Sequence, residues 1–109
     1  MSNTARLGRD REHRVRERMT EDGWVPIMRA AASKGAADLL MAHPEHGAAL
    51  VQVGSKSKTL GPADRERLCQ AAELCGALAL LAIVVPRQPV AYWLVTRETP
   101  SRWAVWPSN

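Results

Sequence analysis

Three side chains with oxygen donors, Glu12, Asp38 and Gln52, are the best candidates for chemistry in this sequence. There is no nucleophile elbow, no glycine-rich phosphate loop and no cysteine–histidine pair at a useful spacing, and the three histidines lack metal-ligand spacing. Asp38 opens an apolar run, where a buried carboxylate needs a counter-charge or a metal ion. Two carboxylates that converge near one end of a sheet suit a hard divalent cation such as Mg²⁺.

Two helices are expected to position these groups. The charged, proline-free stretch 5–22 predicts a helix that ends at Gly23, with Glu12 on the inward stripe that also carries Val15 and Met19. A second helix is expected to open at Leu60-Gly61-Pro62, run to Cys75 and stop at Gly76.

Short apolar runs between these helices and after them predict strands, with a loop over 30–36. The strands are expected over 24–29, 38–42, 48–53, 78–85 and 90–95. The helix between the third and fourth strands is then a parallel crossover. The order αβββαββ predicts an α/β fold with a mixed central sheet and helices on its faces.

Composition sets the broad class. The 109 residues are 46% hydrophobic and 24% charged, which favours one folded domain over disorder. No apolar run approaches a membrane span and no signal peptide is recognisable, so a cytoplasmic protein without membrane contact is expected. Residues 1–4 are expected to form a disordered tail. The segment 97–109, with Trp103 and Trp106, is expected to be a strap over the core or an interface.

The order of short motifs along the chain resembles the PD-(D/E)XK nuclease superfamily, which has a restriction-endonuclease-like fold. Within it, the chain resembles the archaeal-type Holliday junction resolvases and their small phage-encoded relatives, from about Gly8 to Leu94. The motifs are Gly8-Arg9-Asp10-Arg11-Glu12, Gly23-Trp24, Arg29 and Ser33 before Gly35-Ala36-Ala37-Asp38-Leu39, Leu50-Val51-Gln52-Val53, and Pro62-Ala63-Asp64-Arg65.

The resemblance implies roles for individual residues. Glu12 matches the family's helix acid, Asp38 its metal-binding aspartate and Gln52 the acid of the (D/E)XK element, so that all three would hold the metal ion. The sequence departs from the pattern at Gln52, which replaces a carboxylate, and at Gly54, which stands where the lysine belongs.

The missing lysine leaves alternatives open. Side chains alternate along a strand, so positions 52, 54, 56 and 58 share one face, and Lys56 or Lys58 can reach the space above Gly54. Lys56 is assigned here as the catalytic replacement. A bulge at Gly54 would instead turn Ser55 or Ser57 toward the site.

The implied function is a Mg²⁺- or Mn²⁺-dependent endonuclease that cleaves branched DNA. Because a four-way junction has two-fold symmetry, the resemblance also implies a homodimer. The residues expected to contact DNA are Arg9, Arg11, Arg14, Arg29, Ser33, Lys34 and Lys58.

Two other functions are kept open. One is a weakened relative that binds DNA or a protein without cutting, and the other is a nuclease for duplex or flap DNA. Each residue also has an ordinary structural interpretation: Glu12 as the partner of Arg9 or Arg16, Asp38 as a turn residue, and Gln52 as a polar residue on a solvated sheet face.

Overall fold

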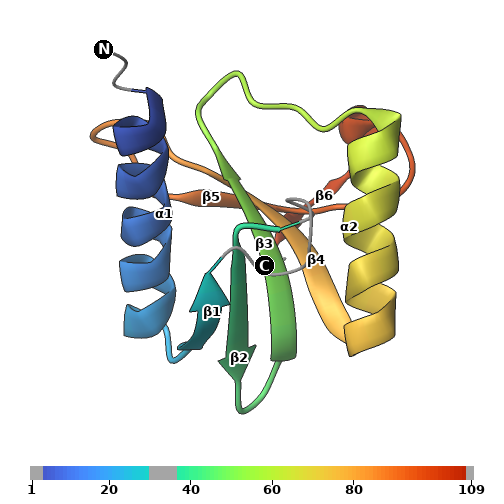
Figure 1. Cartoon of the computed structure of the whole chain (residues 1–109), viewed down its shortest axis with the longest axis horizontal. Coiled ribbons are helices and arrows are strands. Elements are labelled where there is room, and N and C mark those ends of the chain that lie inside the picture. Colours follow the sequence, from blue (N-terminus) through green and yellow to red (C-terminus); the bar gives the residue numbers. More distant parts are fainter. Residues whose placement is uncertain (1–3, 30–36, 108–109) are drawn as a thin grey trace.

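The computed structural model of the chain describes residues 4–29 and 37–107. Two helices, α1 (Thr4–Glu21) and α2 (Pro62–Cys75), lie on either side of a six-stranded sheet (Figure 1). The expected loop over 30–36, which contains Ser33 and Lys34, lies outside the described residues.

The sheet is mixed, as predicted. Its spatial order is the chain order, β1 to β6, and every neighbouring pair is antiparallel except β3–β4, which is parallel across the α2 connection. The strands are β1 (Val25–Arg29), β2 (Leu39–His43), β3 (Gly47–Gly54), β4 (Ala77–Ile83), β5 (Ala91–Leu94) and β6 (Ala104–Trp106).

The sixth strand corrects the predicted order αβββαββ. The segment 97–109 contains a 3₁₀ turn, Pro100–Arg102, and then β6, which pairs with β5 and continues the sheet. A strand of three residues is too short to show an alternating pattern, so only its pairing with β5 defines it. The expected tail over 1–4 is also wrong at its last residue, since α1 begins at Thr4.

The boundaries of α2 follow from its turn residues. Pro62 occupies the first turn, where its missing N–H costs no helical hydrogen bond. Gly76 ends the helix in the left-handed region, at φ 66°, and its N–H donates to the carbonyl groups of Ala72 and Glu73.

Each face of the sheet carries its own apolar layer. Val15 and Met19 of α1 pack with Val51 of β3 on one face, whereas Leu68 of α2 packs with Leu50 on the other. Alternation along β3 therefore places Gln52 and Gly54 on the α2 face, with Leu50. Neither described helix has the length and apolar character needed to cross a membrane.

The α2 layer generates a test of the packing. Leu68 is fully buried, whereas Leu74 on the same helix is 82% exposed. We expect Leu68→Ala to lower the free energy of unfolding by about 2–5 kcal/mol. Leu74→Ala, the matched control, should change it by less than about 0.5 kcal/mol. Urea denaturation measures both values, and equal effects of the two substitutions would contradict this placement of α2.

Candidate active site

Asp38 sits at the start of β2 and is held against β3 by two hydrogen bonds. Its backbone N–H donates to the carbonyl oxygen of Val51 at 2.9 Å, and its carboxylate oxygen Oδ2 accepts the N–H of Val53 at 2.8 Å. These two contacts flank Gln52, which is half-buried on the same strand. The structure therefore places Asp38 beside the part of β3 that contains Gln52, near the carboxyl end of that strand.

Burial sets the electrostatics of Asp38. Loss of hydration raises the pKa of this half-buried carboxyl group above its ordinary value. The hydrogen bond from Val53 and the positive charge of Lys58 act in the opposite direction and lower it, by less than burial raises it. Ionised Asp38 is thus only partly compensated by the protein.

Glu12 reaches the same region from α1. Its side chain is 24% exposed, and Nη2 of Arg29 lies 3.7 Å from its Oε1. Burial raises the pKa of Glu12 and the charge of Asp38 raises it further, while Arg29 lowers it. The two carboxyl groups are therefore close enough to repel each other when both are ionised.

Two of the expected DNA contacts line a cavity together with Glu12. A cavity of about 200 Å³ is lined by residues of α1 with Arg29 and Leu39. Arg9 and Arg29 line it, together with Arg16, whereas Arg11 does not. Glu12 forms its ion pair with Arg29 of β1. The ordinary structural interpretation, in which Glu12 pairs with Arg9 or Arg16 of its own helix, does not account for this ion pair.

Lys58 lies directly over Gly54. A methyl group placed on Gly54 would overlap the Cβ and Cγ atoms of Lys58. The lysine is brought back by a turn in which its N–H donates to the carbonyl oxygen of Ser55 at 2.9 Å. The space that a side chain at position 54 would fill is thus taken by a lysine four residues later.

The strand register removes one of the alternatives left open by the sequence. Residues 48–54 pair one-to-one with residues 77–83 of β4, so Gly54 is not a bulge and alternation along β3 is kept. Lys56 and Lys58 are both exposed and both line an apolar groove, but Lys58 covers Gly54 and its positive charge acts on Asp38, so Lys58 is the better candidate. The sequence could not distinguish Lys56 from Lys58, because the alternation of side chains applies only to an extended strand and the chain turns after Gly54.

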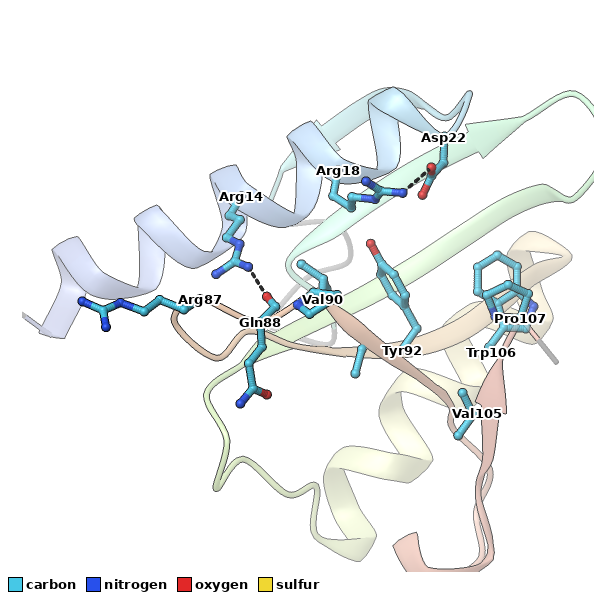
Figure 2. Close-up of a pocket in the computed structure, with 12 residues that line it drawn as sticks. Arg14, Arg18, Asp22, Arg87, Gln88, Val90, Tyr92, Val105, Trp106 and Pro107 are labelled. Atoms are coloured by element: carbon cyan, nitrogen blue, oxygen red, sulfur yellow. Dashed lines mark hydrogen bonds and ion pairs between the residues drawn. The ribbon is translucent and has the colours of Figure 1, made fainter. Parts of the chain in front are cut away.

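A larger cavity lies on the other side of α1 (Figure 2). It measures about 840 Å³ between α1, the β4–β5 turn and the last two strands. Arg14, an expected DNA contact, donates there to the carbonyl oxygens of Val85, at 3.2 Å, and of Gln88. The hydroxyl of Tyr92 points toward α1 and has no hydrogen-bond partner among the described residues. The two hydrogen bonds of Arg14 hold α1 against the turn between β4 and β5.

The hairpin turn between β2 and β3 gathers a second group of polar side chains that the spacing of the histidines did not predict. One possible ligand atom from each of His43, Glu45 and His46 lies within 4.8 Å of the others. However, Nδ1 of His43 accepts the N–H groups of Glu45 and His46, and its Nε2 lies 3.3 Å from the carbonyl oxygen of Asp22. These contacts indicate a role for His43 in holding the turn.

The fold is similar to that of a known resolvase. Hjc, a Holliday junction resolvase from the archaeal hyperthermophile Archaeoglobus fulgidus, superimposes with a TM-score of 0.68 at 20% sequence identity, over 79% of this chain and 70% of that one. No protein-family model matches the sequence, and no curated protein matches it. The structural likeness confirms the restriction-endonuclease-like fold predicted from the motifs.

The raised pKa of Asp38 predicts how stability depends on pH. The folded chain binds this proton more tightly than the unfolded chain, so the ionised carboxylate destabilises the fold above the raised pKa. That penalty is absent below the ordinary pKa of 3.8. Asn keeps an acceptor for Val53, and we expect Asp38→Asn to be more stable than the wild type at pH 7, with the difference vanishing toward about pH 4. Urea denaturation at both pH values measures this, and a difference independent of pH would refute the assignment.

Proposed function

We propose that the chain is a metal-dependent endonuclease of the PD-(D/E)XK type that cleaves branched DNA. The observation that carries this proposal is the convergence of Asp38, Gln52 and Lys58 at one sheet end, with Lys58 in the space above Gly54. The likeness to Hjc, described as a Holliday junction resolvase, supports the choice of reaction and substrate.

The donor set fits a hard divalent cation. Asp38 and Glu12 offer carboxylate oxygens and Gln52 offers an amide oxygen, which are the ligand types that Mg²⁺ and Mn²⁺ accept. Burial raises the pKa of both carboxyl groups, and a cation between them would supply the compensation that the protein provides only in part. Such a cation, when bound, lowers the pKa of an attacking water and polarises the scissile phosphate.

The protein's own residues bind and orient the phosphate. Oδ2 of Asp38 is fixed by Val53, so the carboxylate presents its other oxygen in a defined direction. The Lys58 ammonium, a compact charge, neutralises the charge that develops on the phosphorus oxygens in the transition state. Arg9 and Arg29 line the same cavity as Glu12 and would hold neighbouring phosphates, with Arg11 and Lys34 as further proposed contacts.

A dimer follows from the proposed substrate. A four-way junction carries two symmetry-related cleavage positions, so paired incisions need two active sites related by a two-fold axis. We therefore include a homodimer in the proposal.

One observation favours a second function. Gln52 gives a cation less charge compensation than the expected carboxylate, which weakens metal binding. A relative that binds branched DNA without cutting it would tolerate this change. Cleavage and binding must therefore be measured side by side.

The central prediction compares a labelled four-way junction with a linear duplex of the same sequence. We expect the wild type to cut the junction with Mg²⁺ or Mn²⁺ and to lose this activity with chelator. Asp38→Ala should reduce cleavage by at least about 100-fold, since it removes a charged ligand. Undiminished cleavage by Asp38→Ala would exclude the proposed site, whereas tight binding without cleavage by the wild type would support the second function.

The lysine assignment has its own test, built on the shared space of positions 54 and 58. We expect Lys58→Met to lower the cleavage rate by about 100-fold or more, and Lys56→Met, the matched control, by less than about 5-fold. Gly54→Ala should resemble Lys58→Met, because the added methyl group displaces the lysine. The double variant Gly54→Lys with Lys58→Gly should regain activity over Lys58→Met. A larger loss in Lys56→Met than in Lys58→Met would reverse the assignment.

A further inference from the structure

An apolar groove of about 480 Å³ opens on the α2 face of the sheet, beside Lys58. Its lining comes from β4, β5, the 3₁₀ turn and the segment that follows β3. The lining residues are Lys56, Lys58, Thr59, Leu81, Ile83, Ala91, Trp93, Pro100, Ser101 and Trp103.

Strand register places this groove next to the candidate active site. Gln52 pairs with Leu81 on β4, and Leu81 pairs with Trp93 on β5. Directly paired residues project from the same face of a sheet, and neighbouring strands lie about 4.8 Å apart. Trp93 therefore stands about 10 Å from Gln52 in one row across the sheet. A parallel row runs from Gly54, beneath Lys58, to Ile83 and Ala91.

The lining combines a flat apolar surface with positive charge. Trp93 is half-buried and keeps part of its ring accessible, whereas Trp103 is 7% exposed and is fixed by its indole N–H, which donates to the carbonyl oxygen of Glu98 at 3.1 Å. Lys56 and Lys58 also line the groove, and both are exposed. No carboxylate is among the described residues that line the groove. Aromatic surface beside cations is the pairing that binds nucleotides in single strands, through base stacking and phosphate contacts.

We propose that this groove receives an unstacked nucleobase of the DNA strand that is cut, next to the scissile phosphate. The inference rests on the proposed function and adds a source of substrate preference. A base must leave its stack to enter the groove, and this costs least where pairing is already broken. A branch point supplies such a base and a linear duplex does not, so the groove favours branched DNA through Trp93 as well as through the shape of the junction.

The test combines a groove-filling variant with DNA that lacks single bases. Ala91 is exposed and projects toward the groove beside Ile83, so Ala91→Phe fills it without removing a core side chain. Ala63→Phe, at an exposed position in the first turn of α2, is the matched control. A series of four-way junctions, each with one abasic nucleotide near the branch point, is used for cleavage in Mg²⁺ and for binding in Ca²⁺. Trp93→Leu repeats the measurement without the stacking surface.

We expect one abasic position to lower cleavage by the wild type and by Ala63→Phe about 10-fold or more, as loss of one stacked base predicts. Ala91→Phe and Trp93→Leu should show a similar loss on the intact junction and little further loss on that abasic junction. If the wild type binds the junction but its cleavage responds to every abasic position in the same way as that of Ala91→Phe, the inference about the groove is overturned and the proposed function is not. A change of oligomeric state in Ala91→Phe without this coupling assigns the groove to a second copy and also overturns it. Absence of both binding and cleavage in the wild type overturns the proposed function as well.

Discussion

Because β3 and β4 are parallel, the chain must leave β3 at one end of the sheet and return to the opposite end before β4 begins. The helix α2 makes this connection across one face of the sheet. The carboxyl ends of both strands therefore lie side by side, and Val84 donates its N–H to the carbonyl oxygen of Gly54 there at 2.9 Å. The segment between Gly54 and α2 has to pass over this end. The candidate lysine is carried by that segment, and the groove lies beneath it, so both depend on the same connection.

Hydrophobic spacing and turn residues predicted most of the elements. The hairpin of β2 and β3, the helix between Pro62 and Cys75, and the parallel crossover are all present, because each has strong local signals. The last strand was not predicted, since Ala104–Trp106 has no pattern of its own and exists through pairing with β5. The sequence predicted Asp38 at the start of the second strand and Gln52 on the third, and in the structure Asp38 directly precedes β2 and Gln52 lies in β3. Their roles in the site stay predictions. The turn that returns Lys58 depends on one backbone hydrogen bond to Ser55, which no sequence pattern reveals.

In the candidate site, burial and nearby positive charges shift the pKa values of the two carboxyl groups in opposite directions. Burial raises the pKa of Asp38 and of Glu12. The charge of Lys58 partly offsets this for Asp38, and Arg29 and Arg16 do so for Glu12. Carboxyl groups with pKa values perturbed in this way cluster at sites that bind or react. The neutral side chain of Gln52 limits the negative charge at this sheet end, where a third carboxylate would add to the repulsion between the first two.

The overlap above Gly54 couples two positions that are four residues apart. A side chain at position 54 and a long side chain at position 58 would occupy the same space, so the residues at these two positions should vary together. Among proteins with this fold, a lysine on the strand should accompany a small or displaced residue in the following turn, and a glycine on the strand should accompany a lysine in that turn. A search that requires the lysine at a fixed spacing would miss chains of the second kind, whereas a search based on the shared space would recover them.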